Sequence, residues 1–320
     1  MTTTPIFYTI SADFVPYAAV ALQSLVTFAR PGDHYQVIFL HEDLTSVDQA
    51  ALGDLATSQV AVAFYQLDPT VLAGIANRPE NFLRADFYTP AIFYRLFIAD
   101  LFPQYDRALY VDADSVWAAD PAPLVNHPLN GQLIAAAPDL SVAHVEPMQE
   151  YIRGAIGVPG GDYINSEVLV LNLKRLRDEG FSQHFLKLAQ SYHFDCIAPD
   201  QDYLNAICHG QIEYLKEEFN AMPKDPAYAS EAVAHPTLIH YNLFYKPWHF
   251  GTVMYGEQFW QIASETPFAS QLRAELTGYG KEDQEGDRAK LDRLMAKAGQ
   301  LATATPSFAS VEAASGEVRL

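Results

Sequence analysis

Short apolar runs alternate with segments of helical periodicity through the first 140 residues. The apolar runs predict strands at Ile6–Ile10, Tyr35–Leu40, Val60–Leu67, Arg107–Val111 and Leu133–Ala137. Apolar residues at helical spacing predict helices between them, at Val15–Ala29, Thr45–Ala56 and Ala91–Leu101. Because the strands are apolar almost throughout, the alternation predicts a parallel sheet with helices on both faces.

The second half of the chain is less regular. Strands are predicted at Val168–Leu173 and Thr237–Tyr241, and helices at Lys174–Arg177, Phe181–Gln190, Pro199–Ile207 and Lys281–Leu301. The last residues, Ala302–Leu320, are rich in Ala, Ser and Thr, a composition that predicts fraying. The expected organisation is a main domain over 1–265, a helical extension over 266–301 and a flexible tail over 302–320.

Composition narrows the range of partners. The 320 residues carry a formal net charge of −19, and the twenty basic residues are scattered, so binding to nucleic acid or to an anionic membrane surface is not expected. The N-terminus has no signal-peptide pattern, and no apolar window is long enough for a membrane span. Cys196 and Cys208 lack zinc spacing and read as free buried thiols. We therefore expect a cytoplasmic protein with, at most, peripheral membrane contact.

Two carboxylates follow the apolar run that ends at Val111. Asp112 and Asp114 are spaced two apart, which in an extended strand places both on one face. Ligands of open α/β sheets bind at the carboxyl ends of strands. Hard oxygen ligands suit Mg²⁺ or Mn²⁺, which would also offset the repulsion between the carboxylates and a diphosphate. A strand-end turn with two solvated aspartates is the alternative that this motif alone leaves open.

Four segments together point to a family. They are Thr9–Tyr17, the Asp112-Ala113-Asp114 motif, Asp162–Leu173 with Asp200-Gln201-Asp202, and Ile239–His249. In this order they resemble glycosyltransferase family 8, retaining transferases that include lipopolysaccharide galactosyl- and glucosyltransferases. The resemblance runs from about Ile6 to Trp260.

The resemblance implies a fold and an activity. The fold is the α/β GT-A fold of nucleotide-diphospho-sugar transferases, a Rossmann-like mixed, mainly parallel sheet with helices on both faces, plus a helical C-terminal extension. The activity is metal-dependent transfer of glucose or galactose from a UDP-sugar to a glycan, glycolipid or glycoprotein acceptor. Retention at the anomeric carbon comes from the resemblance alone. Since no side chain reads as a nucleophile, a front-side path assisted by the departing phosphate oxygen is the mechanistic hypothesis.

The resemblance also assigns roles to individual residues. The metal ligands are Asp112, Asp114 and His240, and such mixed carboxylate and imidazole ligation favours Mn²⁺ over Mg²⁺. The catalytic and sugar-binding residues are Asn165, Asp200 and Gln201. The UDP-sugar contacts are Ser11, Asp13, Arg95, Asp112, Ala113, Ser166, Asn242 and Lys246.

Three departures from the family pattern keep other functions open. Ser11-Ala12 stands where a further acid is common, Glu167 where a small residue is usual, and Leu243 where glycine is common. Glu167 could line the acceptor side, pair with a base or point away. A non-catalytic nucleotide-sugar-binding module is one alternative. A haloacid-dehalogenase-type phosphatase is a remote one, because its Asp-x-Asp normally lies near the N-terminus and its later motifs do not fit.

Overall fold

The chain forms two compact units in the computed structural model, which describes residues 4–73, 75, 83–84, 87–88 and 90–320. The first unit comprises Met1–Leu67, Ala108–Pro128 and Lys216–Glu285. The second comprises Asp68–Arg107, Leu129–Leu215 and Gly286–Leu320. The domain boundaries expected at residues 265 and 301 remain predictions.

The first unit is built on strand β1 (Pro5–Thr9). It runs parallel to β2 (Tyr35–His41) on one side and to β6 (Ala108–Val111) on the other, and β2 pairs in parallel with β3 (Val60–Gln66). Ile6, Phe7 and Tyr8 are all fully buried. Because successive strand residues point to opposite faces, both faces of β1 are covered. The parallel sheet predicted from the apolar runs is confirmed.

Helices and a short strand pair complete this unit. Helix α1 (Val15–Phe28) starts with a proline in its first turn, and α2 (Ser46–Gly53) is closed by a reciprocal capping box. Strands β7 (Ser115–Trp117) and β11 (Leu238–His240) form an antiparallel pair, and its Val116 and Ile239 pack with Trp248 in one apolar core. The remaining helices are α4 (Ala122–Val125), α9 (Gly256–Ala263) and α10 (Ala269–Gly278).

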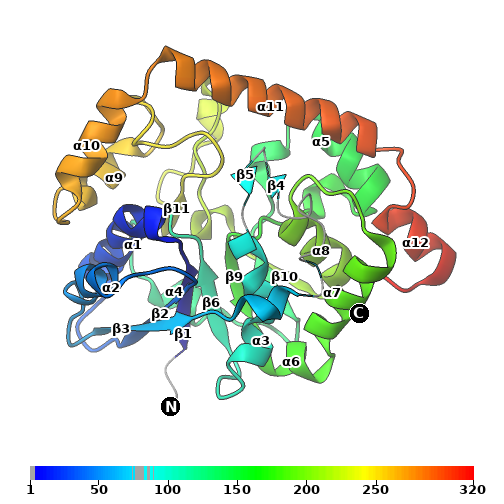
Figure 1. Cartoon of the computed structure of the whole chain (residues 1–320), viewed down its shortest axis with the longest axis horizontal. Helices are drawn as coiled ribbons and strands as arrows, with labels where there is room; N and C mark the ends of the chain where they lie inside the picture. Colours follow the sequence, from blue (N-terminus) through cyan, green and yellow to red (C-terminus); the bar gives the residue numbers. More distant parts are fainter. Residues whose placement is uncertain (1–3, 74, 76–82, 85–86, 89) are drawn as a thin grey trace. The chain divides into compact units, whose positions relative to one another are not determined.

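The second unit contains mixed strand pairing. Strand β8 (Ile134–Ala136) is parallel to β10 (Ile212–Tyr214) and antiparallel to β9 (Val168–Leu171), and β4 (Leu83–Arg84) is antiparallel to β5 (Phe87–Tyr88). Its helices include α5 (Glu146–Tyr151), α6 (Leu173–Asp178), α7 (Phe181–Tyr192) and α8 (Pro199–Cys208), labelled in Figure 1. The mixed, mainly parallel pairing with flanking helices confirms the predicted fold class.

One predicted helix is divided in two. Instead of a continuous helix over Ala91–Leu101, the chain forms the 3₁₀ helix η4 (Pro90–Phe97) followed by the single α-turn α3 (Ile98–Leu101). Within η4 the side chain of Arg95 donates from Nε to the carbonyl oxygen of Ile92, three residues earlier. This hydrogen bond ties the Arg95 side chain to the backbone of its own turn.

The C-terminal segment is helical. Helix α11 (Lys281–Leu301) is followed by α12 (Phe308–Ser315), and Phe308, Val311 and Val318 are buried although the composition of residues 302–320 predicted fraying. Among the described residues, no helix has the length and apolar character needed to cross a bilayer. Cys196 and Cys208 are both free and buried, as predicted, and burial raises the pKa of the Cys208 thiol to about 12.

Candidate active site

The Asp-x-Asp motif lies directly after strand β6, in a bend that leads into β7. The bend is stabilised by the Ser115 hydroxyl, which donates to the carbonyl oxygen of Asp112 at 2.7 Å. Ala113 is buried within it. The two carboxylates have different partners. The Asp112 carboxylate accepts a hydrogen bond from the Tyr110 hydroxyl at 2.7 Å. The expected position at a strand's end is observed, while the backbone between the two acids is bent.

The pairing of β7 with β11 brings His240 to the second carboxylate. His240 lies opposite Ser115 in this pair, and the backbone N–H of Tyr241 donates to the carbonyl oxygen of Asp114 at 2.9 Å. The fully buried His240 ring presents Nε2 at 3.5 Å from Oδ1 of Asp114. That oxygen is buried, and it has no hydrogen-bond partner among the described residues.

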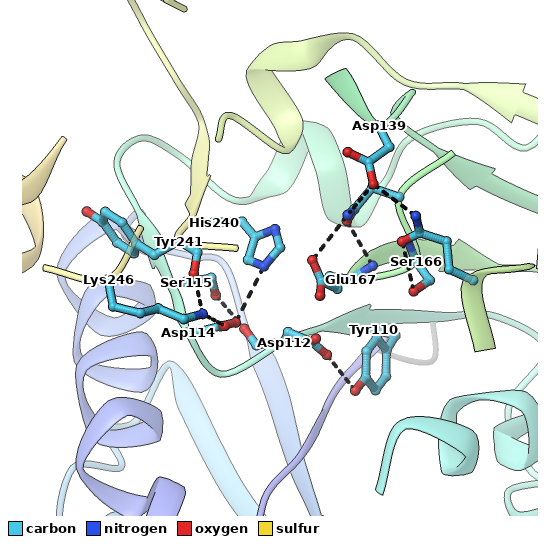
Figure 2. A network of polar contacts seen from close by, with 12 residues as sticks. Tyr110, Asp112, Asp114, Ser115, Asp139, Ser166, Glu167, His240, Tyr241 and Lys246 are labelled. Atoms are coloured by element: carbon cyan, nitrogen blue, oxygen red, sulfur yellow. Dashed lines mark hydrogen bonds and ion pairs between the residues drawn. The ribbon is translucent and has the colours of Figure 1, made fainter. Parts of the chain in front are cut away.

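Lys246 pairs with the other oxygen of the Asp114 carboxylate. Its ammonium lies 2.5 Å from Oδ2 of Asp114 and also donates to the carbonyl oxygen of Tyr241, as Figure 2 shows. The Lys246 side chain is only 13 % exposed, so this ion pair is shielded from water. Asn242 begins the same loop and carries a buried Oδ1 with no hydrogen-bond partner among the described residues.

The loop that carries Lys246 has one unusual backbone conformation. Leu243 has a φ of +47°, in the left-handed region that costs an L-residue about 1 kcal/mol and that glycine adopts without strain. Leu243, which stands where the family commonly has glycine, therefore adopts a backbone conformation that favours glycine. Trp248, two residues after Lys246, is buried in the apolar core of the first unit.

The other nucleotide contacts predicted in the first unit follow β1. Ser11 precedes the 3₁₀ helix η1 (Ala12–Phe14), in which Asp13 is exposed. Phe14 is 40 % exposed, and its ring meets that of Tyr17 edge to face at 5.3 Å. The exposed Phe14 ring beside the exposed Asp13 is a feature that the sequence analysis did not single out. The sequence does show Asp13-Phe14 directly before a helix.

A buried polar network occupies the second unit. Oδ2 of Asp200 accepts from the Ser166 hydroxyl at 2.8 Å and pairs with Nε of Arg95 at 3.3 Å. Arg95 also donates from Nη1 to the carbonyl oxygen of Ser166 at 2.7 Å, and the Gln201 side-chain oxygen accepts from the Ser166 N–H at 3.0 Å. Oδ1 of Asp200 is buried and has no hydrogen-bond partner among the described residues.

Two residues of this network were not assigned from the sequence. Asp139 accepts from the side-chain nitrogen of Gln201 at 2.9 Å and from that of Asn165 at 3.4 Å (Figure 2). It lies two residues after the strand predicted at Leu133–Ala137, so the reasoning applied to Asp112 and Asp114 would have found it. Glu167, whose direction the sequence left open, is buried and accepts from the Asn165 side chain at 3.1 Å.

Asp202 is surrounded by hydrogen-bond donors of the second unit. Its carboxylate accepts from the hydroxyls of Tyr151 and Tyr163 and from the backbone N–H groups of Ile197 and Ala198. Burial raises the pKa of Asp202 to about 6, against the opposing effect of these hydrogen bonds. Asp202 thus holds the start of α8 in place.

The predicted site residues therefore form two groups, each within one unit. The first unit brings together Asp114, His240 and Lys246, and the second brings together Arg95, Asn165, Ser166, Asp200 and Gln201. Over the described part of the chain, no three His, Cys, Asp or Glu side chains converge closely enough to hold a metal ion by themselves.

Comparison with known families identifies the chain. The model described as "Glycosyl transferase family 8" matches residues 5–252. The chain belongs to glycosyl transferase family 8. It is therefore a glycosyltransferase, as the sequence motifs predicted.

The relatives of known name are distant in sequence. A lipopolysaccharide 1,2-glucosyltransferase of Escherichia coli is 28 % identical over 81 % of this chain and 76 % of its own length. A putative glycosyltransferase of Haemophilus influenzae is 23 % identical over 66 % of this chain, which spans 61 % of that relative. Among solved structures, the galactosyltransferase LgtC, solved with donor and acceptor sugar analogues, has a TM-score of 0.68, 23 % identity and coverage of 85 % and 100 % of the two chains. At this identity the likeness shows the fold, which is of the GT-A type.

Proposed function

We propose that this family 8 glycosyltransferase transfers a hexose, glucose or galactose, from a UDP-sugar to a hydroxyl group of a glycan, glycolipid or glycoprotein acceptor, with retention. The observation that carries the proposal is the environment of Asp114. One oxygen of this carboxylate is buried without a hydrogen-bond partner among the described residues and faces the His240 ring, while the other is paired with Lys246. The names of the relatives, a glucosyltransferase and a galactosyltransferase, support a hexose.

The donor atoms near Asp114 fit a divalent cation. A carboxylate oxygen and an imidazole nitrogen lie 3.5 Å apart, and no described residue donates a hydrogen bond to that oxygen, so a cation would satisfy this arrangement. Asp114 and His240 would hold it, Asp112 would complete the protein's share, and the mixed ligand set favours Mn²⁺ over Mg²⁺. A bound cation would offset the negative charge that develops on the departing diphosphate.

The residues of the first unit would bind the nucleotide. Lys246 would contact the diphosphate as a point charge in a chain of net charge −19. Ser11 and Asp13 would contact the nucleoside, and the exposed Phe14 ring beside them offers a face on which a base can stack. Ala113 and Asn242 would line the pocket through the bend and the loop that hold Asp114 and Lys246.

The residues of the second unit would hold the sugar. Asp200 and Asn165 offer side chains suited to hydroxyl groups, and Arg95 with Ser166 fixes the Asp200 carboxylate. The Gln201 carbonyl dipole would stabilise the oxocarbenium-like centre. In the front-side path, the bond from the anomeric carbon to phosphate breaks as the acceptor oxygen bonds to the same face. The acceptor proton passes to the departing phosphate oxygen.

The proposal is tested by UDP release from a panel of UDP-sugars, with Mn²⁺ or with a chelator. We compare the wild type with Asp114→Asn and with Asp120→Asn, a carboxylate of the same unit that pairs with the exposed Arg30 at 3.2 Å. Release from one UDP-hexose that needs Mn²⁺, is abolished by Asp114→Asn and survives Asp120→Asn supports the proposal.

Other outcomes select the alternatives. Binding of UDP without turnover of any donor, across many acceptors, would favour the nucleotide-sugar-binding module. Hydrolysis of phosphate esters that is independent of UDP-sugars and is lost in Asp112→Asn would favour the phosphatase.

A further inference from the structure

Asn165 lies at the start of a protrusion between two strand pairings of the second unit. Strand β8 pairs with β9 in the register Ala135↔Val170, and farther along the bridge is Pro138↔Ile164. Between these pairs one chain advances three residues (135 to 138) and the other six (170 to 164), so three residues are in excess on the second side. Such an excess forces the chain out of the ladder, as in a β-bulge. Because the backbone N–H of Asn165 still donates to the carbonyl oxygen of Ala137 at 2.9 Å, the excess follows Asn165 and includes the turn at Ser166 and Glu167.

The side chain of Asn165 is fixed at both ends of its amide by Glu167. Its Oδ1 accepts from the backbone N–H of Glu167 at 3.1 Å, which closes an Asx turn. Its Nδ2 donates to the Glu167 carboxylate at 3.1 Å, and the same nitrogen lies 3.4 Å from the Asp139 carboxylate. One residue therefore holds the amide through both its backbone and its side chain.

These partners also fix which way the amide is turned. A carboxylate accepts and does not donate, so Nδ2 must face Glu167 and Asp139. A backbone N–H only donates, so Oδ1 must face the N–H of Glu167. With its N–H groups directed at two carboxylates, Asn165 can meet a sugar hydroxyl through Oδ1, as an acceptor.

We propose that Glu167 is a positioning residue for the donor sugar, because it holds the Asn165 amide in the orientation in which Oδ1 accepts from a sugar hydroxyl. This inference rests on the proposed UDP-hexose function. It gives the glutamate that departs from the family pattern a role through Asn165 rather than through direct contact with the sugar.

The test compares the affinity for UDP-hexose with that for UDP, by titration calorimetry in the presence of Mn²⁺. The ratio of the two dissociation constants isolates the contribution of the sugar. In Glu167→Ala we expect the preference for UDP-hexose over UDP to fall about tenfold, the scale of a hydrogen bond to a charged group, with UDP affinity unchanged within about twofold. Glu167→Gln keeps an acceptor for Nδ2 and should retain most of the preference.

A matched control is available in the same unit. The carboxylate of Glu213 accepts from the side-chain nitrogen of Asn130 at 3.0 Å, a contact of the same type. Glu213→Ala should leave the ratio unchanged. An equal loss of UDP and UDP-hexose affinity in Glu167→Ala, or a loss in Glu167→Gln as large as in Glu167→Ala, would overturn the proposal, because either points to a general structural role.

A second readout separates this inference from the proposed function. With ¹⁵N-asparagine labelling, the Asn165 side-chain amide protons should exchange with solvent more slowly in the wild type than in Glu167→Ala. If the wild type bound neither UDP nor UDP-hexose, the proposed function and the sugar-positioning role would both fail, even with the slow exchange present. Equal exchange in the two proteins, with UDP-hexose bound normally, would overturn the positioning role alone.

Discussion

At the scale of single residues, the key contact joins groups far apart in the chain. Lys246 and Asp114 are separated by 132 positions, yet the ammonium lies 2.5 Å from the carboxylate. The sequence predicted both residues for the site, as a phosphate contact and a metal ligand, without predicting that they pair. Because a lysine on a carboxylate offsets the charge that a cation would offset, a bound cation would compete with Lys246 for Asp114.

Replacing Lys246 should separate these two effects. In Lys246→Met, Mn²⁺ should bind about tenfold more tightly when no nucleotide is present, because the competing charge is removed from Asp114. UDP should bind more weakly to the variant, because the diphosphate loses a cationic partner. Electron paramagnetic resonance of free Mn²⁺ measures the first effect, and calorimetry with UDP the second.

The control for this variant is Lys224→Met. Lys224 is a shielded lysine of the same unit and pairs with Glu217 at 2.7 Å. Its loss should change neither affinity. Unchanged Mn²⁺ binding in Lys246→Met would show that the lysine does not compete for the cation.

At the scale of elements, helix α8 depends on a buried acid in its first turn. Asp202 is fully buried and collects four donors, so that the start of α8 is tied to the segment before it and to two tyrosines. The pattern Pro199-Asp200-Gln201-Asp202 predicted the helix start correctly. The tyrosine partners come from elsewhere in the chain and were not predicted.

The raised pKa of Asp202 makes the stability of the protein depend on pH. The carboxyl pKa of Asp202 is about 6 in the folded protein, against an ordinary value of 3.8 for an aspartate. Between these values the folded state holds the proton and the unfolded state has lost it, so the free energy of unfolding falls as pH rises from about 4 to 6 and is then constant. The difference corresponds to about 3 kcal/mol. Urea unfolding of the wild type and Asp202→Asn at several pH values isolates this contribution; parallel pH profiles would contradict it.

Helix α12 is anchored by buried side chains, of which Phe308 is the largest. The Phe308 ring lies 4.0 Å from that of Phe194 and 4.9 Å from that of Tyr203, between centroids, and is almost fully buried. Phe308→Ala should lower the free energy of unfolding by about 3 kcal/mol, because it leaves a cavity among aromatic rings. Tyr245→Ala, at a 40 % exposed ring, should cost less than about 1 kcal/mol in the same urea titration. Equal losses would show that Phe308 is not an anchor.

At the scale of the whole molecule, the net charge of −19 limits what the protein can approach. An anionic membrane surface repels such a chain, and 0.15 M salt screens this repulsion without reversing it. We expect no co-sedimentation with phosphatidylserine vesicles at either 20 or about 150 mM salt. Binding that weakens as salt rises would reveal a local basic surface and contradict the expectation.

Much of the architecture was predictable because it depends on local pattern. The apolar runs at β1, β2, β3 and β6 have the period and length of buried strands, and the Asp-x-Asp follows the last of them as expected. The short strands β7 and β10 and the helices α9, α10 and α12 were not predicted. Strand β7 is only three residues long and is specified by its pairing with β11, which is distant in sequence, rather than by a period of its own.

By itself the sequence determined the family, the parallel strands of the first unit and the identities of the metal- and nucleotide-binding candidates, since these depend on residue type and spacing. Only the tertiary structure decided which side chains meet. It paired Lys246 with Asp114 and made Asp139 a common acceptor for Asn165 and Gln201. The physical reason is that hydrogen bonds and ion pairs act over a few ångströms, and such distances between remote residues exist only once strands and helices have packed.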